Sequence, residues 1–154
     1  MADTSLIENK IGLLVWKVSN FWQSRLRRIL IPFKISLNEY LILLSIKHLL
    51  AQKNDIYQNE ISDFIGIDIS VTSVTLKSLE NKKYISRKLK HDNRKKIIEI
   101  LVKGDNLFQI LQPLIEEEDE LVFNKLNNES FNFTNSLKLL LGKKIRIKAE
   151  KQNL

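Results

Sequence analysis

The feature that most constrains the fold of this chain is a change in the spacing of its apolar residues near Tyr84. Before Tyr84, apolar side chains recur at intervals of three and four residues, which is the spacing of one face of a helix. After it, residues 85–89 and 98–102 alternate between apolar and smaller or polar side chains, as a strand does. The sequence therefore predicts helices followed by a two-stranded hairpin.

The first two helices are indicated by a long apolar stripe and by a capping signal. The stripe runs from Leu6 to Leu30 and ends near Pro32. Ser36 and Glu39 then stand three residues apart just before an apolar run, so that each side chain can bond the other's free backbone N–H. We expect a second helix to begin there and to reach about residue 50.

Two shorter helices should follow, with a tight turn between them. The apolar residues of 61–65 predict a short helix that stops at Gly66, since glycine readily adopts the left-handed conformation that ends helices. Asp68 can cap the next helix, which should continue to about Lys82. A helix, a short turn and a second helix directly before a hairpin predict a winged helix-turn-helix.

After the hairpin the chain should become helical again. The pattern predicts one helix from about 105 to 126, bent or interrupted near Pro113, and another from about 131 to 149. With only 4 glycines and 2 prolines the chain has few residues for the many tight turns of an all-β fold. We expect one domain, mainly α with a small β-hairpin wing.

Positive charge is concentrated around the predicted wing. The chain carries a formal net charge of +7, and nine Lys or Arg residues between 77 and 96 face only two acidic residues. This segment alone therefore accounts for the excess of seven. A basic patch on a helix-turn-helix points to an acidic partner such as double-stranded DNA.

The outer face of the helix that starts at Asp68 is polar and small. It carries Ser70, Ser73 and Lys77, bordered by Val74. Small side chains let the backbone approach the major groove, where Ser and Lys can bind phosphates or base edges and Val74 can contact thymine methyl groups. The alternative is an ordinary solvated helix face.

Cations at the wing tip are suited to a narrow minor groove, whose negative potential attracts them. The tip contains Lys90, Arg94 and Lys95. Phosphates are expected to be neutralised by Lys77, Lys82, Lys90 and Arg94. The alternative for the tip alone is a solubilising charged turn, but its place after a helix-turn-helix favours DNA.

The ordered series of these segments resembles the MarR-type multiple-antibiotic-resistance regulators. The resemblance is carried by residues 66–80 and 82–85, by the wing motif Asp92-x-Arg94, and by residues 98–104 with Gly104 at the end. It covers about residues 11–125. The resemblance implies a winged helix-turn-helix transcriptional regulator in which Asp92 braces the wing.

The resemblance also implies an organisation and an assembly. Residues 1–154 would form a single MarR-like domain, with a DNA-binding lobe at about 36–103 and dimerisation helices at about 6–30 and 105–149. The expected homodimer would act, as a repressor, on a pseudo-palindromic operator. Terminal helices this apolar would leave an exposed patch in a monomer, which agrees with this assembly, although packing onto their own domain is the alternative.

Regulators of this type often bind a small aromatic effector beside the dimer helices. Trp16, Trp22 and Arg25 on the first helix are the candidates for such a pocket. The favoured alternative is that the aromatic rings pack in the core and that Arg25 is a surface residue.

Two residues depart from the family pattern. Lys83 stands in the turn where glycine is usual, and Val74 stands where a polar base-reading residue is common. An alternative function therefore remains, that of a winged-helix protein-interaction module that has lost specific DNA binding. Salt-dependent binding to a duplex separates the two.

Enzymatic functions are disfavoured by missing motifs. The chain has no Cys, no glycine-rich phosphate loop, no paired-His motif and no Gly-x-Ser-x-Gly elbow. We expect no catalytic residues, no cofactor and no metal. Because the start is acidic and no run of about 18 uncharged apolar residues occurs, we expect a cytoplasmic protein without a membrane span.

Overall fold

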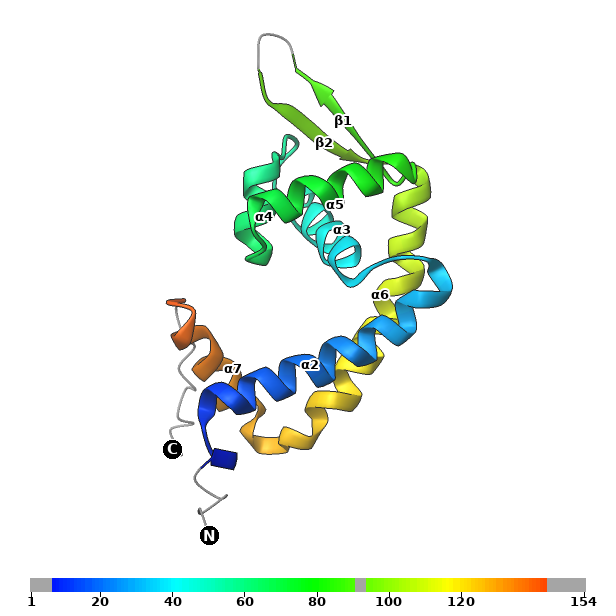
Figure 1. Cartoon of the computed structure of the whole chain (residues 1–154). Coiled ribbons are helices and arrows are strands. Elements are labelled where there is room, and N and C mark those ends of the chain that lie inside the picture. The colour runs from blue at the N-terminus through cyan, green and yellow to red at the C-terminus, as the bar shows by residue number, and fades with distance from the viewer. Residues whose placement is uncertain (1–6, 91–93, 144–154) are drawn as a thin grey trace, which may run out of the picture. The chain divides into compact units, whose positions relative to one another are not determined.

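The computed structural model describes residues 7–90 and 94–143, and it is mainly helical with one antiparallel hairpin, as the sequence predicts (Figure 1). Contacts divide the chain into two compact units, Met1–Glu118 and Asp119–Leu154. The first unit contains the helix-turn-helix and the wing. Each unit is described by itself.

The expected helix over 6–30 is interrupted near its start. Helix α2 spans Ile11–Leu30, whereas Ile7 and Glu8 form a separate helical turn. Lys10 between them has extended backbone angles, φ −66° and ψ 119°. Nothing buries this part of the chain, so packing does not extend the helix backwards. A 3₁₀ turn over Ile31–Phe33 contains Pro32 and ends α2 where the sequence indicated.

Helix α3 spans Leu37–Leu50 and forms the centre of the first unit. Its start is the predicted capping box, because Ser36 Oγ accepts from the Glu39 N–H and the Glu39 carboxylate accepts from the Ser36 N–H. The core includes Ile42, Leu43 and Ile46, which are fully buried. Neighbouring helices pack around this apolar segment.

The helix-turn-helix consists of α4, Gln58–Ile65, and α5, Ile69–Asn81. Gly66 ends α4 with φ +74°, a left-handed conformation that costs little without a Cβ. Asp68 caps α5 by accepting from the Ser70 N–H at 2.8 Å. Both signals were predicted from the sequence.

The turn from α5 into the wing keeps the geometry that glycine would favour, although the residue is a lysine. Lys83 has φ +65°, and the Tyr84 N–H donates to the Leu79 carbonyl while the Lys83 N–H donates to the Glu80 carbonyl. These two bonds define a Schellman motif, which closes the last turn of a helix. The departure at Lys83 therefore does not alter the turn.

The wing is formed by β1, Ile85–Leu89, paired antiparallel with β2, Lys96–Ile100. Ile85 lies opposite Ile100 and Leu89 lies opposite Lys96. The expected second strand reached Val102, and this was wrong, because Val102 is the exposed first residue of α6. The N–H of Ile98 also donates to the Ile56 carbonyl at 3.0 Å, which ties β2 to the segment before α4.

Helix α6 spans Val102–Phe123 and begins three residues earlier than expected. Its first turn lies against the end of the helix-turn-helix, where a Cβ on Gly104 would stand 2.1 Å from the Tyr84 carbonyl oxygen. The interruption expected near Pro113 is absent, since α6 continues through it. Proline has no N–H, so Pro113 cannot donate to the carbonyl of Gln109 four residues earlier. Both residues are exposed, and water can bond this carbonyl instead.

The break in the C-terminal helices comes instead at Asn127, whose φ of 44° and ψ of −119° are not helical. It lies in a 3₁₀ segment, Asn124–Glu129, which is followed by α7, Ser130–Leu140. The expected extension of this helix to about 149 is not found within the described residues, because a turn with Gly142 at φ +68° follows Leu141. Residues 144–149 lie outside the described part.

No single helix in the described part of the chain is long and apolar enough to cross a membrane. The pair Ile11–Phe33 and Leu37–Leu50 passes on length and composition together, with a bend of 88° between them. Much of the apolar character of this pair belongs to α3, whose buried side chains form the core.

Candidate nucleic-acid interface

Helix α5 buries one face and exposes the opposite one. Thr72, Thr75, Leu76 and Leu79 are buried. The exposed stripe contains Ser70, Val74, Lys77 and Asn81, spaced as one helix face. Val74 is 72% exposed at the centre of this stripe. The structure therefore groups three of the residues that the sequence singled out, while Ser73 is half-buried at the edge.

The start of α5 is fixed by Asp68. Its carboxylate accepts from both the N–H and the hydroxyl of Ser70. The bond from the Ser70 hydroxyl, followed by the backbone bond, lowers the pKa of Asp68 and keeps it ionised. Because the hydroxyl proton of Ser70 is used in this way, its oxygen faces outward mainly as an acceptor.

The far end of α5 is anchored to α3 by a polar cluster around Glu39. The nearly buried carboxylate accepts from Ser78 Oγ and from Lys82 Nζ, the latter at 2.9 Å. Burial opposes ionisation of Glu39, but the bonds from Ser78, Lys82 and the Ser36 backbone outweigh it and lower its pKa. Lys82 Nζ also donates to the Lys34 carbonyl at 2.8 Å. Lys82 therefore positions α5 in the DNA-free chain.

Several cations of the wing also have carboxylate partners. Arg87 pairs with Glu80 and Lys88 pairs with Glu99, which lowers the pKa of Glu99. Lys90 pairs with Asp55 of the segment before α4, and the hydrogen bond to this carboxylate raises the pKa of Lys90. The pairs of Arg87 and Lys90 hold the hairpin against the helical part, whereas the pair of Lys88 with Glu99 joins the two strands.

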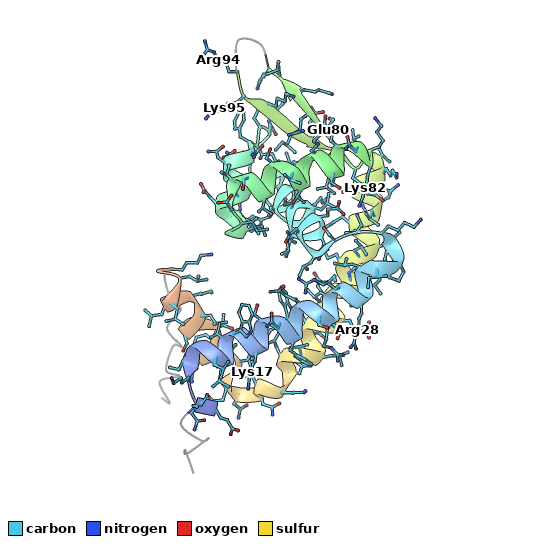
Figure 2. The ribbon with its side chains drawn as sticks, in the orientation of Figure 1. Lys17, Arg28, Glu80, Lys82, Arg94 and Lys95 are labelled. Atoms are coloured by element: carbon cyan, nitrogen blue, oxygen red, sulfur yellow. The ribbon has the colours of Figure 1, made fainter. Side chains whose placement is uncertain are left out.

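Arg94 and Lys95 project from the wing and are exposed (Figure 2). Neither has an ion-pair partner among the described residues, and the same holds for Lys77 and Lys96. These four cations are therefore available to an external anion. Asp92, the expected wing brace, lies outside the described residues.

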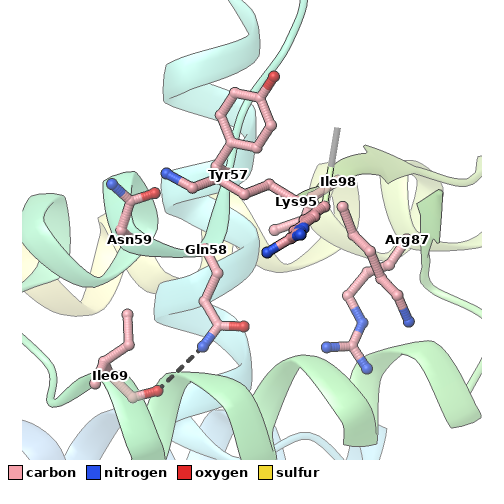
Figure 3. Close-up of a pocket in the computed structure, with 9 residues that line it drawn as sticks. Tyr57, Gln58, Asn59, Ile69, Arg87, Lys95 and Ile98 are labelled. Carbon is pink, nitrogen blue, oxygen red and sulfur yellow. Dashed lines mark hydrogen bonds between the residues drawn. The ribbon is translucent and has the colours of Figure 1, made fainter. Parts of the chain in front are cut away.

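A hollow of about 480 Å³ lies between the wing and the start of the helix-turn-helix. We call it the wing pocket (Figure 3). One side is formed by Tyr57, Gln58 and Asn59, and the apolar part by Ile69 and Ile98. The wing contributes four cations, Arg87, Arg94, Lys95 and Lys96. None of the described residues that line it carries a carboxylate.

The three residues considered for an effector pocket lie in different surroundings. Trp16 is 66% exposed, whereas Trp22 packs against the core. Arg25 pairs with Glu118 of α6 and lies 5.6 Å from the centre of the Phe21 ring. It lines a small cavity of about 220 Å³ to which neither tryptophan contributes. No cluster of three or more metal-ligating side chains occurs in the described part of the chain.

Sequence reasoning missed the α4 side of the wing pocket and the Glu39 cluster. Asn59 and Lys96 are 37 positions apart, and only the fold brings them to one hollow. Lys96 could have been found from the sequence, because it belongs to the basic segment between residues 77 and 96. The polar pair at the start of α4, Gln58 and Asn59, carried no distinguishing pattern.

Together the exposed α5 stripe and the wing define the class of this protein, a winged helix-turn-helix protein. The sequence model of the MarR family matches residues 35–97. Over these residues the chain is similar to the MarR family, and the curated relative that it resembles is described as an HTH-type transcriptional regulator.

The relatives extend beyond the matched segment. An uncharacterised HTH-type transcriptional regulator of Bacillus subtilis, YdcH, is 25% identical over 131 residues, covering 84% of this chain and 88% of the relative. The S. aureus MepR–DNA complex is similar with a TM-score of 0.76 and 22% identity, covering 88% of this chain and 96% of that one. Bordetella bronchiseptica BpsR, whose DNA binding is regulated by 6-hydroxynicotinic acid, gives a TM-score of 0.76 at 13% identity, with 88% and 95% covered. The two structures establish the likeness of the fold.

Proposed function

We propose that this chain is a homodimeric repressor that binds a pseudo-palindromic site in double-stranded DNA. The observation that carries the proposal is the combination of the exposed α5 stripe with wing cations, Arg94, Lys95 and Lys96, that have no carboxylate partner among the described residues. In each half-site α5 lies in the major groove, where Ser70, Ser73 and Val74 face base edges and Lys77 contacts a phosphate.

The wing supplies the second contact. Arg94 enters the adjoining minor groove, Lys95 lies beside it, and Asp92 braces the loop. Lys90 contributes to the positive field but is paired with Asp55 in the free chain. Reaching a phosphate would require it to exchange that partner.

The dimer is supported by exposed apolar residues on α2 and α7, including Ile11, Trp16 and Leu140. Exposed large apolar side chains gathered on one helix are typical of a protein interface. A two-fold axis through such an interface sets the two recognition helices about one DNA turn apart.

Selection of genomic fragments by the purified chain tests the proposal. The expected result is enrichment of one palindromic sequence, bound with an affinity that falls steeply with salt because phosphate contacts release counterions. A chain that binds no duplex at low salt would instead be a winged-helix protein-interaction module, the alternative favoured by the departure at Val74.

We also propose that a small aromatic effector releases the DNA, by analogy with the regulation of BpsR by 6-hydroxynicotinic acid. The first helix is the candidate site, with Trp16, Trp22 and Arg25 as the residues to substitute. Tryptophan fluorescence during titration with aromatic carboxylates measures it, since both tryptophans of the chain lie on α2. Unchanged fluorescence together with unchanged operator affinity across the series would contradict it.

A further inference from the structure

The wing pocket has a surplus of positive charge that contacts among the described residues do not neutralise. Its lining, as far as the structure describes it, contains four cations and no carboxylate. Of these cations only Arg87 has an ion-pair partner among the described residues, Glu80 of α5. The other three positive charges of the lining have no ion-pair partner among residues 7–90 and 94–143, and such a lining favours an anion.

The other side of the pocket offers hydrogen-bond donors. Gln58 is held in place because its side-chain amide donates to the Ile69 carbonyl at 3.3 Å, as the dashed line in Figure 3 marks. The second N–H of this amide and the side-chain amide of Asn59 are further donors of the lining. Donors opposite cations suit an oxyanion with several oxygens, such as a phosphate group.

The position of the pocket identifies the source of that phosphate. In B-form DNA one sugar-phosphate strand separates a major groove from the adjoining minor groove. With α5 in the major groove and the wing in the minor groove, this strand passes between the two elements. The wing pocket lies there, between Ile69 at the start of α5 and the strands of the wing.

We propose that the wing pocket binds one phosphodiester group of the DNA strand that crosses from the recognition helix to the wing. The inference rests on the proposed function, because the strand must be present. A free inorganic phosphate would bind weakly, since Arg94, Lys95 and Lys96 are exposed and screened by water and salt. A DNA phosphate gains in addition from the release of condensed counterions.

The sharpest test places a negative charge in the pocket without disturbing the helix. Asn59 is exposed and is the second residue of α4, where a carboxylate is favourable to the helix dipole. Asn59→Asp should therefore fold normally and bind duplex about tenfold more weakly. Asn38→Asp is the matched control, because Asn38 is exposed at the second position of α3 and lies outside the pocket.

A second variant removes one cation. Lys96→Gln should reduce the slope of log affinity against log salt by about one for each pocket, or about two for a dimer. Lys17→Gln on α2 is the control for a general loss of charge and should leave the slope unchanged (Figure 2).

A scan of the duplex locates the phosphate. Each phosphate of the selected site is replaced in turn by a neutral methylphosphonate, and affinity is measured for the wild type and for both pocket variants. The proposal expects one position per half-site at which the methylphosphonate lowers the affinity of the wild type several-fold. The same replacement should lower the affinities of Asn59→Asp and Lys96→Gln much less, because a double-mutant cycle shows such non-additivity for groups in contact.

The remaining outcomes overturn the proposal in distinguishable ways. Duplex binding that Asn59→Asp and Lys96→Gln leave unchanged rejects the phosphate site and leaves the proposed function standing. A free anion would be assigned to the pocket by two results together. Inorganic phosphate would bind the DNA-free protein saturably in calorimetry, with binding abolished by Asn59→Asp, and no methylphosphonate position would lower the affinity for duplex. A wild type that binds no duplex at low salt rejects both this site and the proposed function.

Discussion

The two ends of helix α2 are built from similar large apolar residues and have opposite environments. Leu26 and Leu30 near the C-terminal end are fully buried in the core of the winged lobe, which we define as residues 35–115. Ile11 and Trp16 near the N-terminal end are 75% and 66% exposed. The winged lobe thus closes its own core, whereas the start of α2 has apolar surface that still needs a partner.

Helix α7 resembles the start of α2 and not the winged lobe. It contains no buried residue. Leu139 and Leu140 at its end are exposed, and so is Leu141, which follows directly. The comparison separates two kinds of residue. Substitutions in the winged lobe should change stability or DNA contacts, and substitutions on the exposed terminal helices should change assembly.

The largest effect is expected when the exposed apolar residues of α7 are made charged. Leu140→Glu should convert a dimer of about twice 18.1 kDa into a monomer while the winged lobe stays folded. Operator affinity should fall by about 100-fold or more, because the two half-sites are no longer bound by one linked molecule. Analytical ultracentrifugation and circular dichroism measure the two parts of this prediction.

The control for that variant is Val102→Glu, which changes an equally exposed apolar residue at the start of α6. It should leave the dimer intact. A wild type that sediments only at 18.1 kDa at micromolar concentration would reject the dimer and with it the interpretation of the exposed apolar residues.

The next effect concerns the stability of the winged lobe. Glu39→Ala removes the acceptor for Ser78 and Lys82 and breaks the capping box of α3. The free energy of unfolding should fall by about 2 kcal/mol, the scale for losing a nearly buried, hydrogen-bonded carboxylate together with a cap. Urea denaturation measures it, and Glu99→Ala on the exposed side of the wing should change stability by less than about 0.5 kcal/mol.

The dependence of this effect on pH has a definite sign. The pKa of Glu39 is lowered in the folded chain, so its ionised form stabilises the fold above the unfolded pKa. That contribution is lost as the pH falls through the folded pKa. The stability difference between the wild type and Glu39→Gln should therefore be present at neutral pH and shrink in acid, below the ordinary glutamate pKa of about 4.3. A difference that persists at lower pH would mean that the charge of Glu39 is not responsible.

A third effect separates a lost DNA contact from a lost structure. Arg94→Ala should weaken specific binding by about 1–3 kcal/mol per contact and reduce the preference for A/T-rich flanks, with unchanged helical content and dimerisation. Lys77→Ala is the comparison, since a phosphate contact should weaken all sequences almost equally. If Arg94→Ala bound an A/T-flanked and a G/C-flanked duplex as tightly as the wild type, the wing would not read DNA.

The same contrast explains how much of the molecule could be predicted from its sequence. The winged lobe carries local signals, such as the capping pair Ser36 and Glu39, Gly66 after α4, and Asp68 before α5, and each acts within a few residues of itself. These signals gave the helices and the hairpin with small errors at their ends. The breaks near Lys10 and at Asn127 lie where neither burial nor a strong cap constrains the backbone.

The parts that could not be predicted depend on residues far apart in the chain. Lys90 meets Asp55, and Lys82 meets Glu39, across 35 and 43 positions. Sequence alone assigned both lysines to DNA phosphates, because a charge count cannot tell a cation with a partner from one without. The wing pocket was missed for the same reason, since its cations and amides come from separate elements.

The smallest effect tests what the exposed α5 stripe reads. Val74 is 72% exposed in the free chain, so covering its methyl groups against a thymine methyl would bring a modest hydrophobic gain of about 0.8 kcal/mol for one methyl group. Replacing single thymines of the selected site by deoxyuridine removes only that methyl group. At one position per half-site, this replacement should lower the affinity of the wild type about three- to fourfold and leave the affinity of Val74→Ala unchanged.

Because Val74 lies outside the core, the variant should keep its stability, so a change in affinity reports the contact itself. If every thymine tolerated the exchange equally in both proteins, α5 would read its site through Ser70, Ser73 or DNA shape instead, and Val74 would be only an exposed residue of the stripe.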